Sequence, residues 1–562
     1  MSNSINQEEE KSEKLLNSEN VGEISKSKLI IFYSLTIGFV LLTIIIVFLI
    51  SSNLGNSNKN PSKTNNLNLV LKYKPDAETE TLLFNSKLIN LISSMKIDDQ
   101  KVINITNVYS FNSTDEHTVE IKLKDYLVDM SQLFKECLKL TEVDLTNLET
   151  KNVNNISEMF YNCNSLTSIK LNNIKTEKII DMSYLFHGCI YLNSLNLNNF
   201  DTSNVENMQY MFSKCTSLAS LDIKNFNTKN LKIMKGMFSG CRNLYNLELG
   251  NNFITSNIKD ISELFSGCYK LSSINLKDID TSKITNMSNL FNGCISLTSI
   301  DFSKFDTSNV VDMTGTFQLC SSFTSLDLNH FDTSKVEYMS HMFDSCNSLK
   351  VINIQNFNTS KVKYMNQMFY RCTSMEYFDV QNLNTSEVIN MEGMFDFCSS
   401  LKFLNLSNFD TSKVTDMSYL FAASSKLISV DLSNFNTKKV TTMNHMFYGC
   451  HSLESLDLSS FDVSNLRSMW VMFNDCRSIK YLNLSNFNTY NTEIMGGTFA
   501  KCYNLTVLDI RNFDSSSLMA NTNLFPEINS NGTIYYNSAK FDKNFLNITN
   551  IKNWVKIDVS EL

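Results

Sequence analysis

The chain has 562 residues, which is too long for one ordinary globular core and predicts several domains or a repeat array. Its formal net charge is −8 and it has no basic stripe, so we expect no nucleic-acid binding, which depends on clustered Lys and Arg. Only 3 prolines occur, and the stretch from Pro75 to Pro526 lacks this breaker of regular structure.

The first element in chain order is an apolar segment from Leu29 to Ile50, which has 22 residues and no charge. A helix of this length, rising about 1.5 Å per residue, spans a bilayer. We expect a retained signal anchor because no small-residue cleavage pattern follows, and cleavage within residues 51–57 is the alternative. Lys26 and Lys28 precede the segment directly, whereas the first lysine after it is Lys59, which favours a cytoplasmic N-terminus. We therefore predict a single-pass type II protein of the cell membrane whose large C-terminal part is extracellular.

The remaining boundaries follow from changes in pattern. The N-terminal tail is polar and charged, which is typical of disorder. The sequence before Met130 and after Phe513 departs from the repeat described below, and arrays of repeats need covered ends. The predicted regions are a cytoplasmic tail (1–28), a transmembrane signal anchor (29–50), a linker (51–66), a strand-rich N-terminal cap (67–129), a leucine-rich-repeat solenoid (130–515) and a C-terminal cap (516–562).

The 14 cysteines form a register with a step of 26 residues, interrupted by one step of 27 after Cys241. We expect the extra residue, near Gly250, to form a local bulge. The position between Cys398 and Cys450 carries Ser424. Such regular spacing indicates a repeat, whereas disulfide scaffolds are short chains with irregular spacing. A position that accepts serine does not require a bridge, so we expect buried free thiols; pairing between adjacent positions, with Cα atoms within about 7 Å, is the alternative.

Each repeat unit has two halves with different periods. From Cys398 the unit reads CSSLKFLNLSNFDTSKVTDMSYLFAA, and its L-x-x-L-x-L part alternates as a strand with one buried face does. Met208, Met211, Phe212 and Cys215 have the i, i+3, i+4, i+7 spacing of a short helix, preceded by an Asn or Asp suited to an N-cap. We predict an α/β solenoid, a leucine-rich-repeat array of about 15 units of 26 residues, with one parallel-sheet face, one short-helix face and terminal caps.

The unit F-[DN]-T-S-x-V-x-x-M-x-x-M-F-x-x-C-x-S-L-x-x-L-x-L resembles the BspA-type leucine-rich-repeat surface proteins. It is most similar to the branch first described as a mycoplasma family of unknown function, over roughly Met130 to Phe513. The resemblance implies a leucine-rich-repeat solenoid with a role in adhesion to host proteins or other cells, but it identifies no ligand. Mycoplasma members are often lipoproteins, whereas the first cysteine here is Cys137, far beyond the apolar segment, so we expect no lipid anchor on an N-terminal cysteine.

No arrangement of residues indicates catalysis. The six histidines have no metal-binding spacing, and no P-loop, G-x-G-x-x-G or G-x-S-x-G motif occurs. We therefore expect no enzyme, no cofactor, no metal and no small-molecule substrate. His187, His341 and His445 fall in the predicted helical parts, and we expect them on the solvated surface.

Two polar rows run along the array. Seven residues after most of the cysteines lies Asp or Asn, as at Asp222 and Asp301, which we interpret as a solvated row; neighbouring carboxylates repel, so a cation or a basic partner is the alternative. Thirteen residues after most of the cysteines lies Thr, as at Thr202 and Thr333. A regular threonine array can match an ice lattice, but its place in D-T-S turns favours hydroxyls that bond to the local backbone.

A third row is irregular and gives the candidate ligand site. Five residues after each cysteine the residue is usually Ser, and apolar or aromatic residues exposed together there suggest a contact site, with drift of the repeat as the alternative. We expect an extracellular protein or cell-surface ligand and thus adhesion. A structural coat of laterally packed solenoids without a foreign ligand is the second hypothesis, and it predicts uniform faces. The replacements are Val351, Tyr377, Phe403, Tyr481 and Val507.

The chain also contains 11 N-x-[S/T] sequons, which matter only in a eukaryote. Possible N-glycosylation sites include Asn104, Asn112, Asn286, Asn405 and Asn531.

Overall fold

The computed structural model describes residues 67–76, 79–277, 279–518, 522–546 and 551–560. These residues belong to one compact unit that begins at Asn66. The predicted tail, the predicted transmembrane segment Leu29–Ile50 and the linker lie outside the described residues. In the part of the chain that is described, no helix is both long and apolar enough to span a bilayer.

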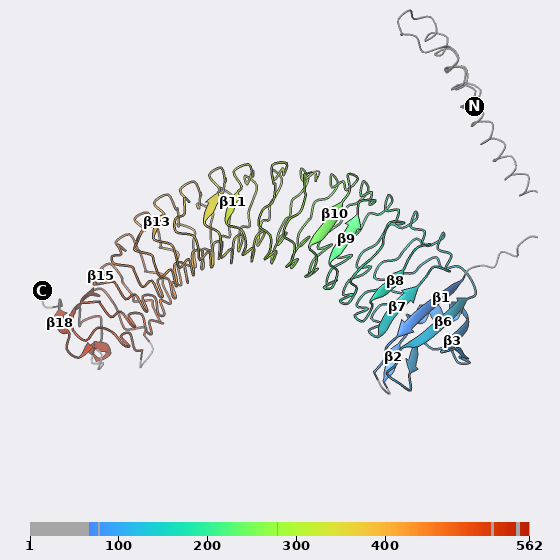
Figure 1. Cartoon of the computed structure of the whole chain (residues 1–562). Coiled ribbons are helices and arrows are strands. Elements are labelled where there is room, and N and C mark those ends of the chain that lie inside the picture. Colours follow the sequence, from blue (N-terminus) through green and yellow to red (C-terminus); the bar gives the residue numbers. More distant parts are fainter. Residues whose placement is uncertain (1–66, 77–78, 278, 519–521, 547–550, 561–562) are drawn as a thin grey trace, which may run out of the picture. The chain divides into compact units, whose positions relative to one another are not determined.

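A mixed sheet covers the first turn of the repeat array, with all its strand pairs antiparallel except β7 with β8 (Figure 1). Its strand order is β4-β3-β6-β1-β7-β8, and β1 pairs antiparallel with β7, the strand of the first turn. Because β1 pairs with β7, the first strand of the stacked turns does not leave an exposed sheet edge. The elements are β1 (Asn68–Tyr73), β3 (Ile92–Ile97), β4 (Gln100–Lys101), β6 (His117–Leu123), β7 (Leu140–Asp144) and β8 (Ser168–Lys170), with the 3-10 helix η1 (Ser86–Leu91) and a separate pair β2 (Glu80–Leu82) and β5 (Val108–Ser110).

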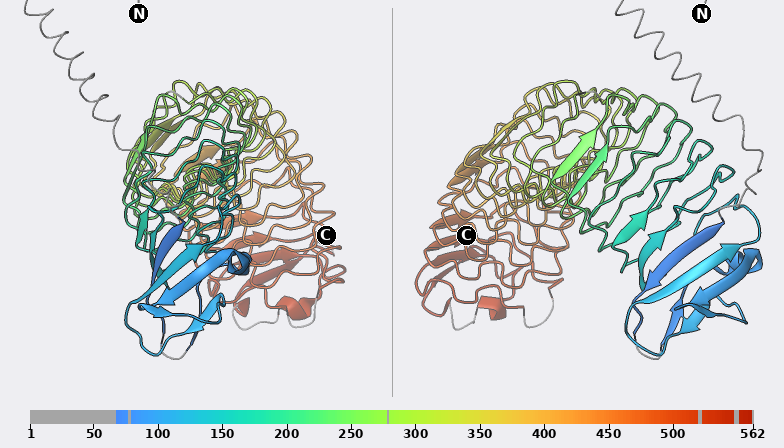
Figure 2. Two further views of the ribbon diagram at one scale, coloured as in Figure 1. Left: turned by 90° about the vertical axis from the view of Figure 1, so that its right-hand side faces the viewer. Right: turned by 45° about the vertical axis from the view of Figure 1, so that its right-hand side comes forward.

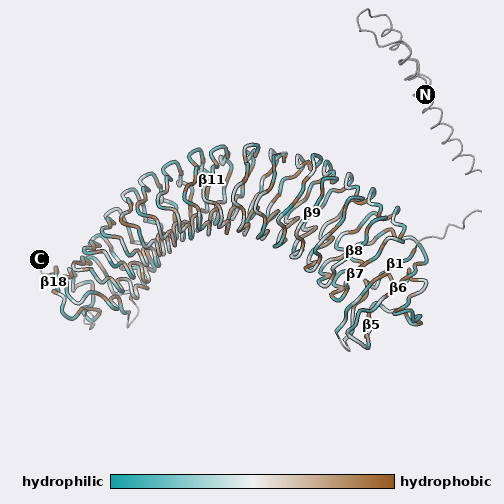
Figure 3. The backbone as a smooth tube through the Cα atoms, viewed as in Figure 1, coloured by the Kyte–Doolittle hydropathy of each residue, from teal (hydrophilic) through white to brown (hydrophobic). Residues whose placement is uncertain are grey.

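From β7 onward the chain winds into a β-solenoid of about 16 turns of 26 residues (Figures 1 and 2). Strands in adjacent turns pair in parallel, as Leu326 does with Ile352, and hydrophilic and hydrophobic residues alternate along each turn (Figure 3). The strands are β9 (Ser220–Ile223), β10 (Asn246–Leu249), β11 (Ser325–Asp327), β12 (Val351–Asn353), β13 (Phe403–Asn405), β14 (Ser429–Asp431), β15 (Tyr481–Asn483), β16 (Val507–Asp509), β17 (Thr533–Tyr536) and β18 (Val555–Asp558), with the 3-10 helix η2 (Lys543–Leu546) before β18.

The predicted short-helix face is wrong, because no α-helix occurs in the described residues. The segment from methionine to cysteine consists of consecutive tight turns. In one unit the N–H of Leu185 donates to the carbonyl of Met182 (3.4 Å), and the N–H of Cys189 donates to that of Phe186 (3.1 Å). The third residue of the first turn, Tyr184, has φ 55°, and Gly188 in the second has φ 75°. Positive φ at the third position is the geometry of a type II turn.

Two consecutive tight turns bring the residues at positions i, i+3, i+4 and i+7 to the same side of the chain. This is the spacing that suggested a helix. Every second N–H group of this segment points along the stack instead of into a helix. Met182 donates to Asn207 (2.9 Å), Tyr184 to Gln209 (2.9 Å) and Phe186 to Met211 (2.9 Å) in the next turn. Since the N–H groups find acceptors within the tight turns, in the neighbouring turn or on the Asp181 side chain, the backbone is satisfied without an α-helix. We call this side of the solenoid the turn face.

The interior carries a continuous stack of phenylalanine rings. Phe160 and Phe186 lie 5.7 Å apart with an interplanar angle of 3°, and the stack extends to Phe499 and Phe525 at 5.5 Å. The cysteines lie beside this stack as buried free thiols, which confirms that prediction. The Sγ of Cys189 donates to the carbonyl of Phe160 at 3.2 Å. Burial raises the pKa of these thiols, so they remain protonated.

The threonine row is buried and joins adjacent turns. Thr202 is 1% exposed, and its Oγ1 donates to the carbonyl of Asn227 (3.1 Å) while accepting from the N–H of Asn227 (2.8 Å). The hydroxyls therefore satisfy backbone groups, as we expected from the D-T-S turns. The ice-lattice alternative is excluded because these hydroxyls do not reach the surface.

The extra residue after Cys241 forms a local bulge, as predicted. β9 and β10 remain in register up to the pair Ile223 and Leu249. Thr255 resumes the threonine row, because its Oγ1 donates to the carbonyl of Asp280 at 2.7 Å. Gly250 lies so close to the preceding turn that a Cβ there would be 2.0 Å from the carbonyl oxygen of Lys224.

Candidate functional site

The strands present alternate side chains to the outside of the solenoid. In β11 the central Leu326 is 6% exposed, whereas Ser325 and Asp327 on either side of it are exposed. We call the outer side of these strands and of the equivalent segments in other turns the strand face. Because partners in neighbouring turns are 26 residues apart, each repeat position forms a row along this face.

The structure places the five predicted site residues in one row of the strand face. Tyr377 bridges in parallel to Phe403, and Tyr481 pairs with Val507. Val351 and Tyr377 are each 61% exposed, Phe403 is 46% exposed and Tyr481 is 53% exposed. Val507 is half-buried.

Two groups result, because serines occupy the row between them at Ser429 and Ser455. We call Val351, Tyr377 and Phe403 the aromatic strip. The distal pair consists of Tyr481 and Val507.

An ion pair flanks the aromatic strip. Lys402 and Glu376, one position before Phe403 and Tyr377, lie 2.7 Å apart across adjacent turns. Their hydrogen bond raises the pKa of Lys402 and lowers that of Glu376. An exposed pair of this kind contributes little stability. Its consequence is geometric, because it holds two long side chains alongside the exposed rings.

The row of Asp and Asn on the strand face shapes the turns that follow the strands. Asp222 Oδ1 accepts from the N–H of Lys224 at 3.0 Å, and Asn483 Oδ1 accepts from the N–H of Ser485 at 3.0 Å. The turn requires only one side-chain oxygen as a hydrogen-bond acceptor, so Asp and Asn can replace each other in this row. The remaining Oδ2 or Nδ2 atom is left for other partners.

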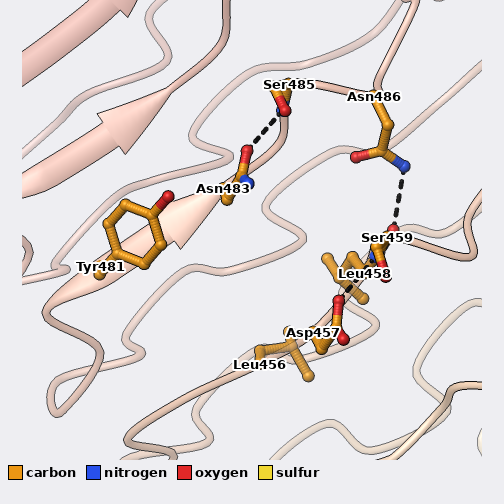
Figure 4. Close-up of a pocket in the computed structure, with 8 residues that line it drawn as sticks. All are labelled: Leu456, Asp457, Leu458, Ser459, Tyr481, Asn483, Ser485 and Asn486. Carbon is orange, nitrogen blue, oxygen red and sulfur yellow. Dashed lines mark hydrogen bonds between the residues drawn. The ribbon is translucent and has the colours of Figure 1, made fainter.

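A hollow of about 280 Å³ lies beside Tyr481, between two adjacent turns (Figure 4). It occurs where the parallel ladder is interrupted: among the described strands, β14 pairs with β13 and β15 with β16, but the intervening segment 455–457 pairs with neither neighbour. The hollow is lined by Leu456, Asp457, Leu458, Ser459, Tyr481, Asn483, Ser485 and Asn486.

Only Tyr481 of these lining residues was predicted from the sequence. The segment 455–457 has the same Ser-x-Asp pattern as the paired β14, so nothing in the sequence indicates the interruption. A smaller hollow of about 70 Å³ lies beside β10 and Asn275, where residues 273–275 form no strand in the described structure.

The turn face carries exposed aromatic residues that the sequence analysis did not single out. Tyr419 stacks on His445 at 4.3 Å with an interplanar angle of 9°, and Trp470 meets His445 edge-on at 4.9 Å. Trp470 is 48% exposed. The signal for this group is the 26-residue repeat itself, because residues one unit apart lie side by side.

The expectation that His187 is solvated is wrong. Its side chain is 7% exposed and stacks on Tyr161 at 4.8 Å, and burial lowers its pKa to about 4. His445 is half-buried, and burial lowers its pKa as well. His341 is also half-buried, with Nδ1 3.0 Å from Asp344. On tandem turns the rings of His187 and His445 stack on tyrosines of the neighbouring unit, whereas on a helix they would extend into solvent.

The sequons fall on different kinds of surface. Asn104, Asn112 and Asn531 are exposed. Asn405 is exposed in β13, two residues from Phe403 of the aromatic strip. Asn286 is half-buried, and its Oδ1 accepts from the N–H of Ser288 at 2.9 Å.

Among solved structures, a leucine-rich cell surface protein of Faecalibacterium prausnitzii has 17% identity and a TM-score of 0.33, covering 69% of this chain and 83% of that one. The functional domain of InlJ from Listeria monocytogenes, which includes a cysteine ladder, has 19% identity and a TM-score of 0.17, covering 62% and 74%. The Toll–Spätzle complex of Drosophila has 14% identity and a TM-score of 0.23, covering 70% and 51%. The fold described above rests on the strand pairing, not on these likenesses.

None of the curated proteins matches this sequence. A family model described as "Mycoplasma protein of unknown function, DUF285" matches it in six overlapping segments, which are residues 83–174, 164–275, 259–377, 339–431, 371–481 and 425–537. The segments together cover residues 83–537, which is most of the chain. The chain therefore belongs to this mycoplasma repeat family.

Proposed function

We propose that the protein binds a protein or cell-surface ligand through the aromatic strip and thereby mediates adhesion. The observation that carries the proposal is the side-by-side exposure of Tyr377 (61%) and Phe403 (46%) on the strand face. Adjacent exposed aromatic residues mark contact surfaces, because their rings supply rigid contact area that becomes favourable when covered.

The irregularity of the strand face favours adhesion over a structural coat. The row that contains the strip carries Ser220 in β9 and Ser325 in β11, but Tyr377 and Phe403 in later turns. Identical turns packed side by side in a coat would require a repeated contact residue. A site for a foreign ligand requires a local change, which is the pattern observed.

We also propose that the protein catalyses no reaction. The strongest potential nucleophiles among the described side chains are the cysteine thiols, and burial raises their pKa, for example to about 12 at Cys241. A protonated, buried thiol is a poor nucleophile. The expected ligand is a macromolecular surface, with no cofactor and no small-molecule substrate.

The proposed location is the cell membrane, with Leu29–Ile50 as a type II anchor and the solenoid outside the cell. Protease treatment of intact cells, followed by blotting for both ends of the chain, tests this. Loss of the C-terminal region with a protected N-terminal fragment supports the proposal. Full protection of the solenoid overturns it.

Adhesion is tested with cells that display the full chain, on surfaces coated with purified extracellular-matrix proteins. The double variant Tyr377→Ala/Phe403→Ala removes the two exposed rings. The matched control Ser273→Ala/Ser299→Ala changes the same row in turns that carry exposed serines. We expect the double variant to lower adhesion at least about tenfold, as loss of two contact residues does, and the control to leave it unchanged.

Full adhesion by the double variant would overturn the role of the aromatic strip. If the wild-type protein adhered to no coated surface but formed lateral arrays on cells, the coat hypothesis would replace adhesion.

A further inference from the structure

We propose that the hollow beside Tyr481 binds one sugar unit of a glycan. This inference goes beyond the proposed function, because it concerns other residues and stands even if the aromatic strip binds nothing. It rests on two fixed polar groups, an exposed ring and an opening between two turns.

The two polar groups are Asp457 and Asn483, which are consecutive members of the Asp and Asn row. They belong to adjacent turns that do not pair as strands here, and both line the hollow. The N–H of Ser459 donates to Asp457 Oδ1 at 2.9 Å, and the N–H of Ser485 donates to Asn483 Oδ1 at 3.0 Å. These hydrogen bonds hold both side chains in position, and both side chains remain exposed (Figure 4).

These hydrogen bonds determine what each side chain still offers. Asp457 retains Oδ2, an acceptor. Asn483 retains Nδ2, a donor, because a backbone N–H requires the amide oxygen and fixes the orientation of the amide. The site therefore presents an acceptor and a donor on neighbouring turns.

Hydroxyl groups satisfy this pair, because an O–H group both donates and accepts. Two neighbouring hydroxyls of a sugar would donate to Asp457 and accept from Asn483. An ammonium or guanidinium group has no acceptor for the amide of Asn483. A phosphate or carboxylate is repelled by Asp457, whose pKa the N–H of Ser459 holds below its usual value. Neutral groups that both donate and accept remain, which are hydroxyls and amides, and the exposed Tyr481 ring in the wall favours a sugar.

The wall of the hollow suits the apolar side of a sugar ring. Tyr481 is 53% exposed and provides a flat aromatic surface with a polar hydroxyl at its end, and Leu456 is half-buried. Asn486 fixes the far wall, since its Nδ2 donates to the carbonyl of Leu458 at 3.0 Å. The volume of about 280 Å³ lies at the lower end of the range for ligand pockets, which favours a single sugar unit.

Another interruption of the ladder, at residues 273–275, gives a comparison. The hollow beside β10 has about 70 Å³, and its aromatic lining residue, Phe253, is buried (4% exposed) instead of exposed. Broken pairing alone therefore does not produce the same site. The hollow beside Tyr481 differs in its larger volume and in its exposed ring.

The test uses the full-length protein and titrations with neutral sugars (glucose, galactose, mannose and N-acetylglucosamine), followed by ligand-observed NMR. Asp457→Asn keeps the Oδ1 that shapes the turn but replaces the acceptor with a donor. Tyr481→Ala removes the aromatic ring from the wall of the hollow. The controls are Asp222→Asn, in the same row but outside the hollow, and Tyr377→Ala in the aromatic strip.

We expect at least one sugar to bind, and its Kd to rise at least about tenfold in Asp457→Asn and in Tyr481→Ala but not in the controls. Absence of binding by all four sugars, or binding that neither variant weakens, would overturn the inference. Binding of arginine methyl ester in place of the sugars, with loss in Asp457→Asn, would also overturn it. Loss of adhesion in Tyr377→Ala/Phe403→Ala leaves this result unaffected, so the two proposals fail separately.

Discussion

The hydroxyl of Ser424, which interrupts a row of cysteines, donates to the backbone carbonyl of Phe395 at 2.8 Å. The neighbouring cysteines make the same contact: Cys398 Sγ donates to the carbonyl of Phe369 at 3.2 Å, and Cys450 Sγ donates to that of Phe421 at 3.2 Å. The position therefore requires a small buried donor that reaches the preceding turn. A disulfide is not part of this requirement, which explains both the free thiols and the one serine.

This contact predicts the effect of substitution at another cysteine. Cys372 donates to the carbonyl of Phe343 at 3.3 Å, so Cys372→Ser should retain the bond, whereas Cys372→Ala leaves a buried carbonyl without its donor. We expect Cys372→Ala to lower the free energy of unfolding by about 1–2 kcal/mol more than Cys372→Ser. Urea unfolding followed by circular dichroism measures the difference. Equal losses in the two variants would refute the role assigned to the thiol.

The burial of the thiols predicts their reactivity. All 14 cysteines are buried, and burial raises the pKa of Cys241 and Cys502 to about 12. A polar thiol reagent should therefore label none of them in the native protein at neutral pH and all of them after denaturation. Counting of modified cysteines by mass spectrometry gives the answer. Rapid labelling of several cysteines in the native state would show that the stack of turns opens there.

Gly250 should tolerate no side chain. A Cβ at this position would lie 2.0 Å from the carbonyl oxygen of Lys224, and the backbone of the preceding turn cannot move away cheaply. We expect Gly250→Ala to destabilise the protein by about 1–3 kcal/mol, as overpacking does. Gly496→Ala is the control, because a Cβ there would meet Trp470 at 3.5 Å, an ordinary contact. Similar unfolding midpoints for the two variants would contradict this explanation of the bulge.

Asp396 on the turn face predicts a pH dependence of stability. It is 6% exposed, its Oδ1 has no hydrogen-bond partner, and burial raises its pKa to about 7. Because the folded pKa lies above that of the unfolded chain, the folded state holds the proton more tightly, and stability falls as the pH rises from about 4 to about 7. Asp396→Asn should remove this fall and, above pH 7, stabilise the protein by roughly 1–4 kcal/mol.

Thermal unfolding between pH 4 and pH 8 measures this effect. Asp410→Asn is the control, because hydrogen bonds from Ser412 lower the pKa of Asp410 and give the opposite sign. The stability that Asp410 contributes is present above its unfolded pKa and is lost as the pH falls through its folded pKa. Parallel pH profiles for Asp396→Asn and the wild type would show that Asp396 is ionised in the folded protein.

The strand half of the fold was predictable from the sequence, but the other half was not. Leu326 and Ile352 alternate with exposed neighbours as a half-buried strand does, and they pair as the 26-residue step requires. Met182, Leu185 and Phe186 have helical spacing, but consecutive turns place the same positions inside. The sequence does not distinguish the two, because the deciding hydrogen bonds go to the next turn.

The candidate sites show the same division. The row position of Tyr377 and Phe403 follows from the repeat, so their adjacency was predictable. The hollow beside Tyr481 depends on missing pairing at residues 455–457, and Ser455 and Asp457 look like their paired equivalents in β14. The burial of His187 depends on its stacking on Tyr161 in the preceding turn, which a helical interpretation does not bring together.

Photo-crosslinking from the strand face tests most directly whether the aromatic strip is the ligand site. A photoreactive phenylalanine analogue would replace Tyr377 or Phe403, and for comparison Ser273 or Ser299 of the same row, in the full chain bound to a matrix protein that supports adhesion. We predict crosslinks to that protein from positions 377 and 403 and none from 273 and 299. Equal crosslinking from all four positions, or crosslinking only from 273 and 299, would contradict the account.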